Sequence, residues 1–199
     1  MAVLVILGHP RKGSFNHAIA ERAVEALSGN GHDVIFHDLY DEGFPALLSR
    51  DELRRDASLS PDIERHCSEL AAADGIIIIH PNWWGQPPAI LKGWVDRVFR
   101  PGVAYEFVGD DTGAGVPSGL LKARSALVFN TSDTPKEREM EAFGDPLESL
   151  WASCILGYCG IPEIRRKTYG VIVTSTEKER EAWLQDVAET VARAFPAPS

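Results

Sequence analysis

Residues 8–16, which read GHPRKGSFN, are the first in the chain whose types suit a ligand. They join a short apolar run to a stretch with helical spacing that Ser14 could cap. Backbone N–H groups at a helix N-terminus, with Ser and Asn side chains beside them, suit a phosphate group. A tight turn with a capping serine is the alternative. A Walker A loop needs Lys directly after its second Gly, but Ser14 and Phe15 follow Gly13. The GxGxxG dinucleotide fingerprint is also absent.

A second unusual segment, residues 81–88, reads PNWWGQPP. The flat faces of Trp83 and Trp84 could border a planar ring system, and backbone groups of the loop could hydrogen-bond the edge of that ring. Alternatively, the two tryptophans cover the core or a subunit interface, and we expect at least one of them to do so.

Other patterns leave several chemistries without support. The sequence has no His-Glu-x-x-His, Cys-x-x-Cys or Gly-x-Ser-x-Gly motif, so nothing favours a zinc hydrolase, a dithiol redox protein or an α/β-hydrolase. His32 and His37 lie five residues apart on an expected strand and would face opposite sides, where they cannot share a metal. We therefore expect no metal site, and we expect Cys154 and Cys159 to be core residues.

Length and composition predict one soluble domain over residues 1–199. Lys and Arg number 20 against 29 Asp and Glu, and a net charge of −9 disfavours binding to nucleic acid or to an anionic membrane. Three sparse cysteines indicate a reducing compartment. No signal sequence and no apolar segment of about 20 residues is apparent. The expected location is the cytoplasm, with no membrane-spanning segment.

Apolar strands alternate with helices, which predicts a doubly wound parallel sheet in the order 2-1-3-4-5. In that order, ligands bind at the switch point between strands one and three, next to the loops of residues 9–16, 80–88 and 130–135. We expect a long loop over residues 102–119. The expected strands are 2–7, 34–39, 75–79, 125–129 and one within 163–173, and the expected helices are 14–28, one from 60, 89–99, 146–158 and 176–194, with a short one at 50–56.

The sequence resembles the flavodoxin-like NAD(P)H:quinone oxidoreductases, which include quinone reductases, drug-activity modulators and potassium-efflux ancillary proteins. The resemblance rests on Gly8-His9-Pro10 with Ser14-Phe15-Asn16, and on residues 80–99, HPNWWGQPPAILKGWVDRVF. A third set of matching residues consists of Gly144-Asp145, Leu150-Trp151 and Cys159-Gly160. The resemblance implies a flavodoxin-like fold, a bound FMN or FAD, NADH or NADPH as hydride donor, a quinone-like acceptor and a homodimer.

The resemblance also implies roles for particular residues. Residues of the first loop would hold the phosphate and ribityl chain, and those of the second and third loops would border the isoalloxazine. Tyr105 and Phe107 would line the substrate pocket of the partner subunit. The implied flavin-binding residues are His9, Ser14, Phe15, Asn16, Pro81, Asn82, Trp83, Trp84, Asn130, Thr131, Ser132 and Asp133.

Two departures from the family pattern stand out. The third loop reads NTSDT where the family has Thr before paired glycines, so backbone approach to the ring must differ. The proton-handling Tyr and His of the mammalian enzymes are missing, and the matching positions are Glu137 and Phe143 in a loose alignment. The catalytic acid is therefore unknown. A flavodoxin-type electron carrier and a flavin-binding regulatory subunit of a transporter remain alternatives.

Overall fold

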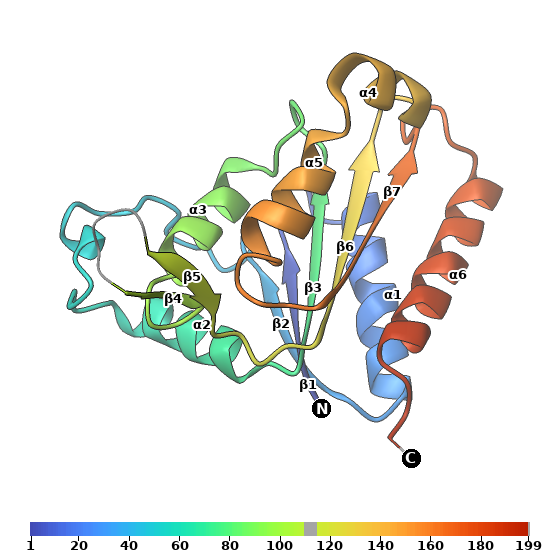
Figure 1. The fold of residues 1–199 in the computed structure, drawn as a ribbon. Coiled ribbons are helices and arrows are strands. Elements are labelled where there is room, and N and C mark those ends of the chain that lie inside the picture. The colour runs from blue at the N-terminus through green and yellow to red at the C-terminus, as the bar shows by residue number, and fades with distance from the viewer. Residues whose placement is uncertain (110–114, 199) are drawn as a thin grey trace.

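Five strands form one parallel sheet in the order β2-β1-β3-β6-β7 (Figure 1). The computed structural model describes residues 1–109 and 115–198. Counted within the sheet, this is the predicted order 2-1-3-4-5, and the prediction of a flavodoxin-like doubly wound fold is confirmed. The strands are β1 (Ala2–Leu7), β2 (Asp33–Asp38), β3 (Gly75–Pro81), β6 (Ser125–Ser132) and β7 (Glu163–Gly170).

Alternating side chains of the central strands supply two apolar cores, one on each face of the sheet. On β1, Leu4 and Ile6 join the core under α2 (Pro61–Ala72) and α3 (Ala89–Val98). Val5 and Leu7 join the core under α1 (Phe15–Gly29) and α6 (Glu177–Ala194) on the other face. A strand that is buried on both faces reads as a continuous apolar run, which is why β1 and β3 were predictable.

Two helices begin where the sequence predicts. The Ser14 hydroxyl accepts the backbone N–H of His17 at the start of α1. In α6, Thr176 and Glu179 form the predicted capping box, in which each side chain accepts the other's backbone N–H. Both caps satisfy amide groups that a helix cannot pair internally.

The predicted long loop over residues 102–119 is wrong for its described part. β4 (Tyr105–Val108) pairs antiparallel with β5 (Val116–Gly119), and residues 110–114 lie outside the described residues. This hairpin projects from the α2 and α3 side of the molecule (Figure 1). Each strand has only four residues and is mostly exposed, and β5 contains Gly and Pro, so the alternation in β4 is too short to predict a strand.

Other differences concern helices, one histidine and one cysteine. The prediction that Cys154 is a core residue is wrong, because it is exposed, whereas Cys159 is buried as predicted. The predicted helix 146–158 is α5 (Pro146–Glu148) followed by π-helical turns over Ser149–Ile155, and the short helix is a 3-10 turn over Asp51–Leu53. α4 (Lys136–Phe143) was not expected, since it buries no residue and shows no apolar stripe. His32 precedes β2, so it does not share a strand with His37.

We searched the described residues for a helix both long and apolar enough to cross a bilayer, and none qualifies.

Candidate functional site

A cavity of about 250 Å³ lies where the loops after β1, β3 and β6 meet. It is at the carboxyl ends of the strands, next to the switch point between β1 and β3, where the topology predicts a ligand. All the predicted flavin-binding residues line it except Trp84 and Asn130. The lining side chains are His9, Arg11, Ser14, Phe15, Asn16, Pro81, Asn82, Trp83, Thr131, Ser132, Asp133, Thr134 and Ile172.

The first loop presents the N-terminus of α1 to this cavity. Ser14 is the N-cap, and Gly13 adopts a positive φ of 68° just before it. No side chain crowds Gly13, but a residue with a Cβ would be strained at that φ. The helix dipole and the first-turn amides favour a negative group here.

Asn16 carries the clearest mark of a missing ligand. Its side chain is buried, and its Nδ2 donates to Thr131 Oγ1 at 2.8 Å. Its Oδ1 is also buried and has no hydrogen-bond partner. A buried polar atom without a partner costs about 1–3 kcal/mol, so a ligand that donates a hydrogen bond to Oδ1 would recover that free energy.

The second loop is a tight hairpin with Trp84 and Gly85 at its tip. Trp83 and Gln86 exchange two backbone hydrogen bonds of 3.0 Å, and both tip residues have positive φ. Trp83 is 42% exposed beside the His9 ring, whereas Trp84 is fully exposed. Neither tryptophan covers the core of this chain, contrary to that part of the expectation.

The third loop is joined to the second by the backbone. The Asn82 N–H donates to the Thr131 carbonyl at 2.7 Å, so this carbonyl already accepts a hydrogen bond from within the protein. The Ser132 hydroxyl accepts the Thr134 N–H at 3.0 Å, and Asp133 accepts the Val173 N–H at 2.8 Å. These bonds give the loop a fixed shape without the paired glycines of the resembling family.

Asn130 lies in the protein interior instead of lining the cavity. Its Nδ2 donates to His80 Nε2 at 2.9 Å, and its Oδ1 accepts from Arg166 at 3.0 Å. Trp151 Nε1 also donates to His80 Nε2, so His80 Nδ1 carries the proton and donates to the Pro81 carbonyl at 2.8 Å. Burial lowers the pKa of His80 to about 4 and keeps the ring neutral. Asn130 and His80 thus hold together the ends of β3 and β6, from which the second and third loops continue.

Tyr105 and Phe107 lie on β4, away from this cavity. Their rings meet edge to face with centroids 5.7 Å apart, and Tyr105 also contacts Tyr158. Phe107 is exposed. Within one chain, the structure does not bring these aromatics to the predicted flavin site.

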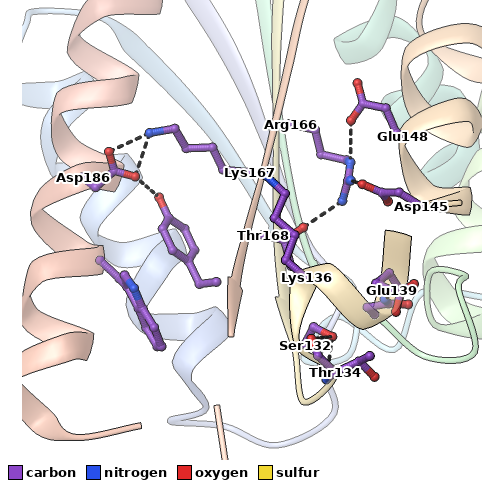
Figure 2. A pocket seen from close by; sticks show the side chains of 13 residues that line it. Ser132, Thr134, Lys136, Glu139, Asp145, Glu148, Arg166, Lys167, Thr168 and Asp186 are labelled. Atoms are coloured by element: carbon purple, nitrogen blue, oxygen red, sulfur yellow. Dashed lines mark hydrogen bonds and ion pairs between the residues drawn. The ribbon is translucent and has the colours of Figure 1, made fainter. Parts of the chain in front are cut away.

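A larger cavity of about 440 Å³ adjoins the first and shares Asn82, Ser132 and Thr134 with it. Figure 2 shows Arg166 with Asp145 and Glu148 on one side of it and Lys167 with Asp186 on the other. Both basic side chains are therefore neutralised by carboxylates. Sequence patterns did not reveal this cavity, because most of its lining comes from α4, β7, α6 and the start of α5, outside the three predicted loops.

Glu137 and Glu139 differ in where they face. Glu137 is exposed on α4, which weakens the loose match with a proton-handling position. Glu139 lines the larger cavity, and its Oε1 accepts a hydrogen bond from Asn82 Nδ2 at 3.0 Å. Of these two carboxylates, Glu139 is the one that contacts the loop after β3.

A buried histidine pair lies on the α2 and α3 side of the sheet, apart from these cavities. The ligand atoms of His37, Glu42 and His66 lie within 4.8 Å of one another, which could suit a small cation. However, Trp94 Nε1 donates to His66 Nδ1 at 3.2 Å, so neutral His66 carries its proton on Nε2, the atom that would have to bind the metal. Both nitrogens of His37 face carboxylates of Glu42 and Glu69. The group is satisfied as a hydrogen-bonded network.

The residues of the first cavity fit a flavin. The α1 N-terminus suits its phosphate, the unpartnered Asn16 Oδ1 suits a hydroxyl donor of its side chain, and Trp83 supplies an aromatic wall. These three features come from the first two loops and converge on one cavity, so the fold and the site together define a flavodoxin-like α/β protein with a candidate ligand site at its switch point.

Comparison with known proteins agrees with this class. A family model described as flavodoxin-like fold matches residues 1–192. A Haemophilus influenzae protein named as an NAD(P)H oxidoreductase is 33% identical over 190 residues, which are 94% of this chain and 92% of that protein. NAD(P)H dehydrogenase (quinone) 1 of Rattus norvegicus is 37% identical over 180 residues, covering 79% of this chain and 64% of the rat protein.

A solved structure, Smu.1420 from Streptococcus mutans, matches with a TM-score of 0.85 and 30% identity, covering 97% of this chain and all of that one. The chain belongs to the flavodoxin-like-fold family that includes the NAD(P)H oxidoreductases. The resemblance drawn from the loop motifs is confirmed.

Proposed function

We propose that this protein is a flavin-dependent NAD(P)H oxidoreductase that reduces quinones or similar acceptors by two electrons. The observation that carries the proposal is the unpartnered Asn16 Oδ1 at a cavity where three loops of the family meet. A bound FMN or FAD would supply the chemistry for hydride transfer from NADH or NADPH to the acceptor.

The residues of this chain would bind the flavin and orient its ring. Ser14 and the first-turn amides of α1 would hold the phosphate, and Asn16 Oδ1 would accept a hydrogen bond from the ribityl chain. Trp83 and Asn82 would border the ring, with Asn82 oriented by the Glu139 carboxylate. His80 and its buried partners would keep this loop in place when substrates exchange.

The acceptor site is proposed to need a second copy of the chain. Tyr105 and Phe107 lie far from the cavity in one chain, and Trp84 leaves a bare aromatic face beside it. A homodimer that brings the hairpin of one copy to the cavity of the other would enclose the ring and exclude water. Residues 1–199 would then form one domain of a cytoplasmic enzyme.

The test is steady-state oxidation of NADH and of NADPH with a soluble quinone, with and without added FMN or FAD. The proposal predicts flavin-dependent turnover and the parallel double-reciprocal lines of a mechanism in which donor and acceptor use one site in turn. Slow turnover with every acceptor, together with an air-stable one-electron-reduced flavin, would instead favour an electron carrier.

A further inference from the structure

The N-cap of α1 belongs to a partly buried hydrogen-bonded chain that leads away from the cavity. Ser14 Oγ and His17 Nδ1 lie 2.8 Å apart, and His17 Nε2 lies 3.1 Å from Asp38 Oδ2. Asp38 ends β2, and its other oxygen accepts the backbone N–H groups of Tyr40 and Asp41. The chain Ser14–His17–Asp38 thus joins the cavity to the loop after the neighbouring strand.

The hydrogens of this chain can be counted. The Asp38 carboxylate only accepts, so His17 Nε2 must donate to it. In a neutral ring, His17 Nδ1 then has no hydrogen, and Ser14 must donate its single hydroxyl hydrogen to it. Ser14 Oγ therefore presents only lone pairs to the cavity, and such an atom repels a phosphate oxygen.

From this count we propose that phosphate binding at the α1 N-terminus takes up a proton from solvent onto His17. When the Ser14 hydroxyl turns to donate to a phosphate oxygen, His17 Nδ1 loses its partner unless it gains a hydrogen. Protonated His17 donates to Ser14 Oγ and Asp38 Oδ2 together, and only the Ser14 hydroxyl separates its positive charge from the anion. His17 is thus a positioning residue that acts through Ser14.

Other charged groups near His17 compete with it or adjust its charge. The His9 ring lies 6.1 Å from the His17 ring and is the other nearby histidine that can gain a proton. Burial lowers the pKa of His9, which makes it the weaker competitor for that proton. Other charged groups of the described residues around this end of α1 include Arg11 and Asp133, which line the cavity, the ion pair of Lys12 with Asp41, the exposed Glu21 one turn along α1, and Arg180 over the Phe15 ring.

The inference rests on the proposed flavin site, and calorimetry separates the two. FMN and riboflavin share the ring and ribityl chain, and only FMN has the phosphate. Each is titrated into apoprotein at about pH 8, where a phosphomonoester is already fully ionised, in buffers of different ionisation enthalpy. The slope of binding enthalpy against buffer enthalpy gives the number of protons taken up.

We expect FMN binding to take up a fraction of a proton and riboflavin binding to take up none. By linkage, FMN affinity then falls by up to about tenfold per pH unit as pH rises, and riboflavin affinity stays level. The His17→Gln variant should abolish the FMN-specific uptake, the Asp38→Asn variant should reduce it, and the control variant at exposed Glu21, Glu21→Gln, should keep it.

FMN binding without proton uptake would overturn the inference and leave the flavin site intact. Proton uptake that persists in His17→Gln and disappears in His9→Gln would overturn it as well, because His9 would then be the group that gains the proton. If neither FMN nor riboflavin binds the parent protein, the proposed function falls together with the inference.

Discussion

Replacing Asn16 by Asp changes a charge at the flavin cavity while almost preserving shape. The side chain is 2% exposed and contacts Thr131 Oγ1 at 2.8 Å. An aspartate can keep that hydrogen bond with its direction reversed, because the Thr131 hydroxyl can donate to a carboxylate. The local packing should therefore survive, and the new negative charge is the main perturbation.

The size of the effect follows from Coulomb's law for a phosphate at the α1 N-terminus, for which we take a separation of about 10 Å. At an effective dielectric constant of about 20, two unit charges about 10 Å apart repel by about 1.7 kcal/mol. Since about 1.4 kcal/mol is a factor of ten, FMN should bind Asn16→Asp at least ten times more weakly. Riboflavin should lose much less affinity, because the carboxylate accepts ribityl hydroxyls at least as well as the amide oxygen does.

The assay is quenching of flavin fluorescence on titration with apoprotein at low salt. Gln185→Glu, an exposed position on α6, is the charge-matched control and should bind FMN like the parent. Thermal unfolding of both variants checks that each is folded. Equal FMN affinity in Asn16→Asp and the parent would refute the placement of the phosphate near Asn16.

Three further predictions test other parts of the account. Burial lowers the pKa of His66 and of His80 to about 4, below the value of about 6.5 in an unfolded chain, so the unfolded state binds more protons and stability falls as pH drops from about 6.5 to about 4. Urea unfolding should show a loss of up to about 1.4 kcal/mol per pH unit for each histidine, and a flat profile over that range would contradict their burial as neutral rings. Replacing exposed Glu137 by Gln should change the rate of flavin reduction by NAD(P)H less than about tenfold, well below a general-acid effect. A hundredfold loss in Glu137→Gln by stopped flow would instead assign it an acid role. Glu139→Gln should weaken the hydrogen bond that anchors Asn82 and alter the KM for the acceptor. Sedimentation should give a homodimer at micromolar concentration, and a 21.8 kDa species would contradict the shared acceptor site.

The sheet and the three loops could be predicted because their signals are local. Strands such as β3 are apolar throughout, since both faces are buried, and the caps at Ser14 and Thr176 use short-range hydrogen bonds. Parallel order then places the loops together by topology alone. The cavity between them was thus predictable, although its chemistry at single atoms was not.

The remaining features depend on contacts between residues distant in sequence. Asn130 was assigned to the flavin, but His80 and Arg166 hold it inside the protein, and both are 36 or more positions away. The Asn16–Thr131 bond spans 115 positions. The exposed hairpin β4–β5 has strands of only four residues, which are too short for their periodicity to predict it.

The cavity at the carboxyl ends of β1, β3 and β6 is proposed to bind a flavin that NAD(P)H reduces. The most direct measurement titrates apoprotein with FMN and with FAD, and then adds NADH or NADPH followed by a quinone without oxygen. We predict that one of the two flavins binds at one per chain, that its visible absorption bleaches with NAD(P)H, and that the quinone restores it. Failure to take up either flavin, or a bound flavin that neither NADH nor NADPH bleaches, would contradict the account.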